Sequence, residues 1–505
     1  MKQKSNAKTV QTALDDLEYG PLHSKEAYSR VGKTKIPEGV NQKRLMRDIT
    51  LIAWPSFVEL LLTQLTSMAD QIMVGQIGGV SGVQGLTAVG LASMPKFLMM
   101  TAIMSMNVGT TAIVARSRGQ QDRRRANRAF RQAMMLNLIA SFLLMIVGFA
   151  SSAWMIGFMG GSGIAAETLA LGASYLRIQF LGFVPLCLTT TITAALRGVG
   201  DTRTPMIYNT VANVVNLFFN YMMIYGKFGC PAMGVAGASF ATVIGQTVAF
   251  AIAMKNVLGK KRYLRIRLRR RFHFDADIMR TVASIGIPSM FESLIMRLGI
   301  ILFQRVVAGL GDNMYATHQV VSNIQSMSLM IGQAFGNAST TLMGQSLGKR
   351  RFDMAAAYVK FTRMLGGAVS LVCAAAMVVF NDDLIRLYNT TPEVVATGAN
   401  LMWMIAFLVP VQGDQFIVSG GLRGVGDTRY PAMTALVCTL AVRMIMSYLL
   451  VLWMGLGIYG AWLAILSDML LRAALMRSRY RSGKWKVHVR RRAQQEMQQQ
   501  KSVPA

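Results

Sequence analysis

Long apolar stretches alternate with short polar connections along most of this chain. Each stretch is about as long as a helix that crosses ~30 Å of hydrocarbon. The pattern predicts helices at 49–75, 86–115, 129–156, 167–195, 204–225, 233–254, 281–308, 316–346, 364–380, 393–421, 431–453 and 457–476. We therefore predict an all-α membrane protein with twelve transmembrane helices. The apolar share of 53% and the charged share of 15% exclude a soluble enzyme.

Positive charge lies in alternate connections between the predicted helices. The formal net charge is +30, and most lysines and arginines fall in the tails or in connections such as 116–131, 255–280 and 347–363. The positive-inside rule places these segments, and therefore both termini, in the cytoplasm. The basic run from Lys260 to Arg271 lies between two spans, so it indicates an anchor beside anionic lipid rather than a nucleic-acid site.

The chain contains a duplication. LRGVGDTRTP at 196–205 returns as LRGVGDTRYP at 422–431, WPSFVELLLTQL from Trp54 matches IPSMFESLIMRL from Ile287, and VARSRG at 114–119 matches MGQSLG at 343–348. Each half has six spans, an even number, so both enter the bilayer in the same sense. We predict two parallel six-helix repeats around a central cleft, where substrate sites tend to lie.

The predicted boundaries follow from the helices and the charged connections. A cytoplasmic tail covers 1–48, an N-lobe 49–254, a basic cytoplasmic linker 255–280, a C-lobe 281–476 and a second cytoplasmic tail 477–505. We expect a multi-pass protein of the cell (plasma or inner) membrane. Its expected partners are the lipid bilayer and a small-molecule substrate, with no nucleic acid, and we expect a monomer.

Several motifs together are similar to those of the multidrug and toxic compound extrusion (MATE) transporters. They are the paired RGVGDTR loops, MADQIMVGQIGG at 68–79 and PAMGVAGASFATVIGQ at 231–246. The resemblance implies a cation-driven antiporter that exports drugs or amphipathic metabolites by alternating access. It also implies that Asp70, which precedes I-M-V-G, is a coupling acid. Two other acids of the family are replaced here by Asn220 and Met296, so the coupling ion, H⁺ or Na⁺, stays open.

Two polar stripes share one spacing in the first half. The first holds Glu59, Thr63, Thr66 and Asp70, and the second holds Asn209, Asn213, Asn216 and Asn220. At ~100° per residue each stripe lies along one helix face. Two such stripes predict a hydrated pocket where carboxylates exchange H⁺ or Na⁺ for substrate, and helix packing by hydrogen bonds is the alternative.

Further charged residues within the predicted helices are candidates for the same chemistry. Glu292 is the repeat counterpart of Glu59, and Asp414 is an extra acid in helix 393–421. The two glutamates could serve coupling, or they could bind a partner helix or an arginine. The cations inside predicted helices are Lys96, Arg177, Arg297, Arg305 and Arg443. The arginines among them either pair with acids or make a cavity, with Arg297 as its candidate residue, that selects anionic or zwitterionic substrates.

Pro55 and Pro288 lie well inside predicted helices, where a proline removes a backbone hydrogen bond and permits bending, so we predict hinges there. The four histidines have no metal-ligand spacing, and we predict neither a metal nor another cofactor apart from the coupling ion. Two other functional classes stay open: a lipid-linked oligosaccharide flippase and a non-transporting scaffold or receptor.

Overall fold

The structure is a computed structural model that describes residues 41–77, 79–160, 165–259, 262–266, 274–386 and 392–486. Most of the predicted tails and part of the predicted linker therefore lie outside the described residues. The helices of the first half are α3 (Gln42–Gly75), α4 (Gly79–Gly119), α5 (Arg123–Gly160), α6 (Ala166–Leu181), α7 (Phe183–Val199), α8 (Arg203–Tyr225) and α9 (Gly234–Leu258).

The second half repeats this order, with some irregular segments. Its helices are α10 (Ala276–Ala308), α11 (Asp312–Gly348), α12 (Phe352–Val379), α13 (Asn381–Arg386), α14 (Pro392–Val425), α15 (Arg429–Ala435), the π-helix η3 (Leu436–Val442), α16 (Arg443–Ser447), the π-helix η4 (Tyr448–Trp453) and α17 (Gly457–Arg481). The described chain is thus a helical protein, as the sequence predicts.

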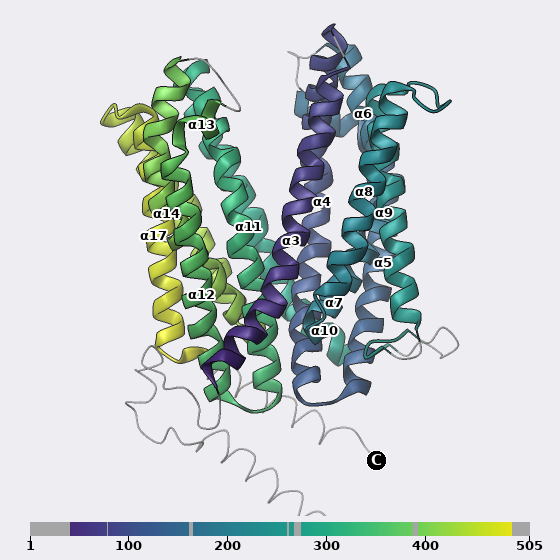
Figure 1. The fold of residues 1–505 in the computed structure, drawn as a ribbon, viewed down its shortest axis with the longest axis vertical. Helices are drawn as coiled ribbons and strands as arrows, with labels where there is room; N and C mark the ends of the chain where they lie inside the picture. Colours follow the sequence, from purple (N-terminus) through teal and green to yellow (C-terminus); the bar gives the residue numbers. More distant parts are fainter. Residues whose placement is uncertain are drawn as a thin grey trace, which may run out of the picture.

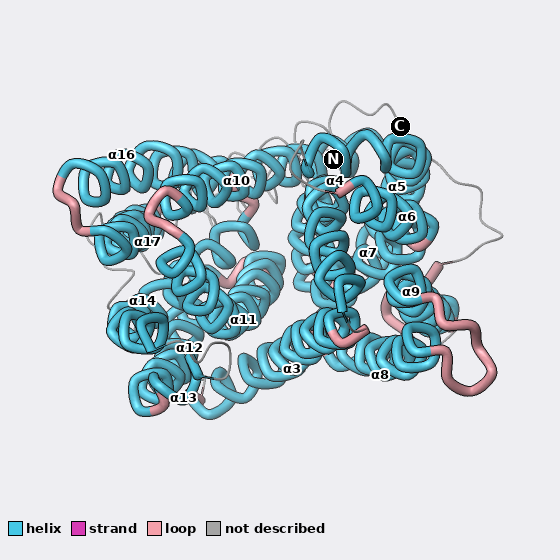
Figure 2. The backbone as a smooth tube through the Cα atoms, turned by 90° about the horizontal axis from the view of Figure 1, so that it is seen from above, coloured by secondary structure: helices cyan, strands magenta, loops and turns pink. Residues whose placement is uncertain are grey.

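The two halves form two separate helical bundles, the N-lobe and the C-lobe (Figure 1). The lobes lie close together at the end where α4 meets α5 and α11 meets α12. They diverge toward the end that carries α6 and α13 (Figure 1). We refer to these as the converging and diverging ends. Seen from above, α3 and α10 lie on opposite sides of the space between the lobes (Figure 2).

The predicted spans are present, with one break in the N-lobe. Among the described residues, nine helices are long and apolar enough to cross a membrane, and α6 with α7 makes a tenth if the pair is one bent span. This pair, predicted as a single helix at 167–195, bends by 51°. Gly182 lies at the break, and Pro185 shortly after it has no N–H to continue the helix. The long helices α8 and α11 complete the set of twelve.

The eleventh predicted span, 431–453, is helical throughout but not uniformly α-helical. The two π-helical segments, η3 and η4, flank the five residues of α16. Such π-bulges occur often at functional sites. The short α16 begins at Arg443, a charged residue that is buried in the C-lobe.

The first helix of each lobe begins against the other lobe. Leu45 and Ile49 of α3 belong to a hydrophobic cluster with residues of α11 and α12, whereas Glu59 and Asp70, farther along α3, contact α8. Ile278 and Val282 of α10 likewise pack in the N-lobe core, and Phe303 packs in the C-lobe core.

Pro55 and Pro288 lie where these two helices pass from one lobe to the other. Each proline therefore removes a backbone hydrogen bond at a crossing point, which is where a bend would change the angle between the lobes. The hinge role itself stays a prediction.

At the converging end, the lobes meet through equivalent residues of the duplication. Gly119 and Gly348 are the final glycines of the repeated segments, and each approaches the other helix so closely that a Cβ would overlap its backbone carbonyl. The hydroxyl of Thr341 donates to Arg197 O at 3.0 Å, and Gln345 Nε2 donates to Gly198 O at 3.0 Å. We call this set of contacts the seam.

The repeated RGVGDTR segments form turns between helices, α7 to α8 and α14 to α15. Gly200 and Gly426 occupy equivalent positions and have φ of +90° and +91°, a conformation that favours glycine. These segments carry Arg197 and Arg423, whose partners are described below.

Candidate functional site

The two predicted polar stripes face each other between α3 and α8. Asn209 Nδ2 donates to Glu59 Oε1 at 2.7 Å, and Asn220 Nδ2 donates to Asp70 Oδ1. Both contacts join residues 150 positions apart, so the helices run side by side in constant register. The equal spacing of the stripes in the sequence arises from this parallel packing.

Asp70 is held by neutral amides. Besides Asn220, the Asn216 side chain reaches the same carboxylate oxygen at 3.0 Å when its amide is turned so that nitrogen faces the acid, and its oxygen then accepts from Thr242. Asn216 and Asn220 are buried, whereas Asp70 is partly exposed. Within the described residues, no lysine, arginine or histidine nitrogen lies within 4.0 Å of its carboxylate, the distance of an ion pair. The site is a carboxylate of a partly exposed residue that accepts from neutral amides.

The other members of the stripes are less connected. The hydroxyls of Thr63 and Thr66 donate to the carbonyls of Glu59 and Leu62, four residues earlier in the same helix, at 2.8 Å each. Asn213 Nδ2 is buried and has no hydrogen-bond partner among the described residues. The predicted pocket lining is thus divided into two contact points, one at Glu59 and one at Asp70.

Lys96 of α4 is the functional candidate to which the sequence assigned no role. Its Nζ donates to Gln179 Oε1 of α6 at 2.5 Å, and its charge interacts with that of Asp70. Gln179 lies 83 residues away and is a neutral side chain on an apolar helix, so no pattern in the sequence links it to Lys96. A lysine within an apolar helix is itself a signal of function, although it does not identify the partner.

Glu59 and Glu292 bind the arginines of the repeated loops. Arg197 lies 2.8 Å from Glu59 Oε2, and Arg423 lies 2.7 Å from Glu292 Oε1. The acids and the arginines are repeat counterparts, so the two ion pairs are equivalent. Each joins the first helix of a lobe to the turn that follows its α7 or α14.

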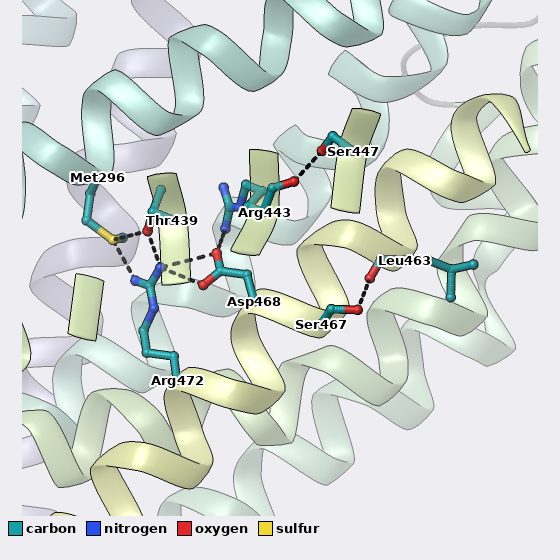
Figure 3. Close-up of polar contacts among 8 residues, drawn as sticks. All are labelled: Met296, Thr439, Arg443, Ser447, Leu463, Ser467, Asp468 and Arg472. Atoms are coloured by element: carbon teal, nitrogen blue, oxygen red, sulfur yellow. Dashed lines mark hydrogen bonds and ion pairs between the residues drawn. The ribbon is translucent and has the colours of Figure 1, made fainter. Parts of the chain in front are cut away.

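Two further acids of the C-lobe, Asp414 and Asp468, are each shared by two arginines. Asp414 contacts Arg363 and Arg477, the latter at 2.9 Å. Asp468, which is fully buried, lies 2.5 Å from Arg443 and 2.8 Å from Arg472 (Figure 3).

Arg472 also reaches Thr439 and Met296, the position where the resemblance would place a glutamate (Figure 3). The C-lobe therefore has guanidinium groups beside the acids of its spans, whereas Asp70 in the N-lobe has amides.

Arg297 does not pair with an acid in the described part of the chain. Its guanidinium lies 3.7 Å from the ring centroid of Phe97, so it forms a cation–π contact between α10 and α4. The expected pairing of membrane arginines with acids holds for Arg443, whose partner is Asp468. Arg297 instead links the two lobes through an aromatic ring.

Two equivalent helical lobes, a converging seam and charged residues within the spans define a membrane transporter rather than an enzyme. The family model of MatE matches residues 55–222 and 288–449, one segment in each lobe. The chain therefore belongs to the MatE family, and the predicted membership and fold are confirmed.

Relatives and solved structures agree with this assignment. The uncharacterized transporter YisQ of Bacillus subtilis is 28% identical over 86% of this chain and 94% of its own length. A probable multidrug resistance protein NorM of Thermotoga maritima is 25% identical over 90% and 94%. The outward-facing structure of a multidrug resistance MATE family transporter matches with a TM-score of 0.80 at 21% identity, covering 90% of this chain and 99% of that one.

Proposed function

We propose that this protein exports small amphipathic molecules across a cell membrane in exchange for protons, with Asp70 as the coupling acid. The observation that carries the proposal is the set of partners of Asp70. Its carboxylate contacts the amides of Asn220 and Asn216, while Glu59, Glu292, Asp414 and Asp468 contact arginines. Positive charge in alternate connections supports an orientation with both termini in the cytoplasm.

A coupling acid must exchange its cation during each cycle. An acid bound by guanidinium groups would lose strong, charge-assisted contacts on protonation, and its arginines would be left unpaired in the membrane. Asp70 carries a smaller cost, because the side chains that hold its carboxylate are neutral amides. Its partial exposure gives it a path to protons or to a cationic substrate. This contrast favours Asp70 over the other predicted coupling residues.

The groups around Asp70 favour a proton over Na⁺. Sodium, a hard cation, needs several oxygen ligands, but the Asn220 amide presents its nitrogen to the carboxylate. A proton needs only the carboxylate, so we propose proton antiport and treat sodium as an outcome of the test.

The proposed cycle follows from competition at one carboxylate. Ionised Asp70 attracts the positive group of a substrate on the cytoplasmic side. After the lobes rock about the seam, with bending at Pro55 and Pro288, a proton from outside neutralises the acid and the substrate leaves. The divergence of the lobes toward the end that holds Asp70 supports an outward-facing state (Figure 1). The names of relatives such as the NorM proteins support drugs as substrates.

The test measures uptake of the cationic dye rhodamine 123 by proteoliposomes under an imposed pH gradient or an imposed sodium gradient. We expect the wild type to respond to the pH gradient and Asp70→Asn to lose that response. Asp383→Asn, which changes an exposed acid of α13, is the matched control and should behave as the wild type. Coupling to sodium alone would contradict the proposed ion, and unchanged proton-driven transport by Asp70→Asn would contradict the site.

A further inference from the structure

Lys96 is a cation inside the N-lobe whose partner is neutral. Its Nζ donates to Gln179 Oε1 at 2.5 Å, and Gln179 is 1% exposed. In the described chain, no carboxylate oxygen lies within 4.0 Å of this nitrogen, the distance of an ion pair. Lys96 as a whole residue is partly exposed, although its ammonium is desolvated by the surrounding helices.

A lysine in this state is costly in a membrane and has unused binding capacity. A charge within the bilayer costs several kcal/mol unless it faces water or a partner. The ammonium has three N–H donors, and Gln179 accepts from one of them. Within the described residues, the other two donors have no protein acceptor, so a carboxylate that reached this nitrogen could accept from them.

Asp70 is close enough to Lys96 for their charges to interact, yet each has its own neutral partner. Asn220 of α8 holds Asp70, and Gln179 of α6 holds Lys96. The N-lobe therefore presents one anionic and one cationic group that are separately supported and partly exposed. This pair has the charges that a molecule with one ammonium and one carboxylate would need.

We propose that Lys96 binds the carboxylate of zwitterionic substrates while Asp70 binds their cationic group. This inference rests on the proposed export function and specifies its substrate class. Lys96 acts as a point charge and attracts a carboxylate in many orientations, which suits substrates of different shapes. It also repels molecules that carry a cation alone, because no group of theirs offsets its charge.

The other membrane cations are less suited to this role. Arg443 and Arg472 share Asp468 and are buried, at 6% and 1% exposure. Arg297 has its guanidinium stacked on Phe97, the residue that follows Lys96. The matched control is Lys227, an exposed lysine of the connection between α8 and α9 in the same lobe, because it carries the same charge outside the helices.

The experiment compares two dyes that differ only at the carboxyl group. Rhodamine 110 carries a free carboxylate and is a zwitterion, whereas rhodamine 123 is its methyl ester and a cation. Binding is measured by fluorescence anisotropy with the purified protein, and transport with proteoliposomes under a pH gradient. The variants are Lys96→Gln, Lys96→Arg and the control Lys227→Gln, with folding checked by thermal melting.

We expect Lys96→Gln to weaken binding and transport of rhodamine 110 by about tenfold, the effect of losing one charge-assisted contact. Rhodamine 123 should be unaffected or bind more tightly. Lys96→Arg should retain rhodamine 110, and Lys227→Gln should bind and transport both dyes as the wild type does.

Four results would overturn the assignment of Lys96. The first two are an equal effect of Lys96→Gln on both dyes and no effect on either. The others are selective loss of rhodamine 110 in Lys227→Gln and a wild type that binds rhodamine 123 but not rhodamine 110. If neither the wild type nor any variant couples transport to the pH gradient, but Lys96→Gln still loses rhodamine 110 selectively, the proposed function is contradicted. The assignment of Lys96 as a carboxylate-binding residue is then still supported. Absence of binding of both dyes would contradict both proposals.

Discussion

The two lobes share one bundle plan but place their acids in different surroundings. In the N-lobe, Asp70 contacts amides of α8 and lies near Lys96. In the C-lobe, Asp414 and Asp468 each lie between two arginines. The lobes agree only at Glu59 and Glu292, where the ion pairs are equivalent. Duplication thus preserved the structural pairs, while the acids outside them acquired different partners.

This difference indicates that the two lobes have different roles in the protein. An acid shared by two arginines makes charge-assisted contacts that join helices, as Asp468 of α17 joins α16 to α17. An acid held by amides can change its charge without leaving a partner unpaired. The N-lobe is therefore suited to ion exchange, whereas the ion pairs of the C-lobe are suited to holding its helices together.

The largest expected effect is on the stability of the C-lobe. Asp468→Asn leaves Arg443 and Arg472 buried without a counter-charge, which costs about 3–5 kcal/mol. We expect a large drop in melting temperature and in the yield of folded protein. Asp70→Asn should melt close to the wild type, because its partners are neutral. Equal destabilisation by the two substitutions would contradict the contrast between the lobes.

A smaller effect is expected at the equivalent ion pairs. Glu292→Gln removes the charge-assisted contact with Arg423, and we expect a loss of about 1.5–3 kcal/mol in the free energy of unfolding. Glu59→Gln should lose a similar amount because its pair with Arg197 is equivalent. Chemical unfolding in detergent measures both. The swapped pair Glu292→Arg with Arg423→Glu should recover part of the loss, and no recovery would show that the contact is not the cause.

A substitution at the seam is expected to shift the equilibrium between conformations in which the lobes are in contact there and conformations in which they are apart. Gly348→Ala places a methyl group against the carbonyl of Arg116, where the two lobes meet. Overpacking of this kind costs about 1–3 kcal/mol in the state that closes the seam. We expect greater labelling of a cysteine introduced at the converging end, near Gln120, than in the same protein with Gly348. Gly367→Ala, where a Cβ meets open space, is the control and should leave labelling unchanged.

The smallest expected effect on stability, and a clear one on transport, concerns the crossing helices. Pro55→Ala restores the ability of α3 to form an unbroken hydrogen-bond ladder. We expect normal membrane insertion and a melting temperature at or slightly above that of the wild type, with slower efflux. Efflux at the wild-type rate would refute a hinge at Pro55, and Pro288→Ala tests the same idea in the C-lobe.

Much of the fold follows from patterns that repeat along the chain. The duplicated loops, the even number of spans and the prolines at 55 and 288 can all be identified in the sequence. The break at Gly182 and the π-helices η3 and η4 cannot be predicted in this way, because they depend on how α7 and α15–η4 pack rather than on apolar periodicity. The contact between Gly119 and Gly348 could not be predicted either, since a close approach between two lobes leaves no periodic pattern in the sequence.

The candidate site was partly predictable for the same reason. The stripes of α3 and α8 share one spacing, and this predicted that Asp70 and Asn220 lie together. Lys96 and Gln179 have no such pattern, because a single pair between α4 and α6 produces no repeat. The sequence also left open whether Glu59 and Glu292 bind arginine, and it could not identify Arg197 and Arg423 as the partners.

Proton release on substrate binding tests the central claim most directly. Purified protein in weakly buffered detergent is mixed with rhodamine 123 while a pH indicator reports protons. The account predicts that binding releases protons from the wild type and from Glu292→Gln, and that Asp70→Asn binds dye without releasing any. Proton release by Asp70→Asn equal to that of the wild type would contradict it.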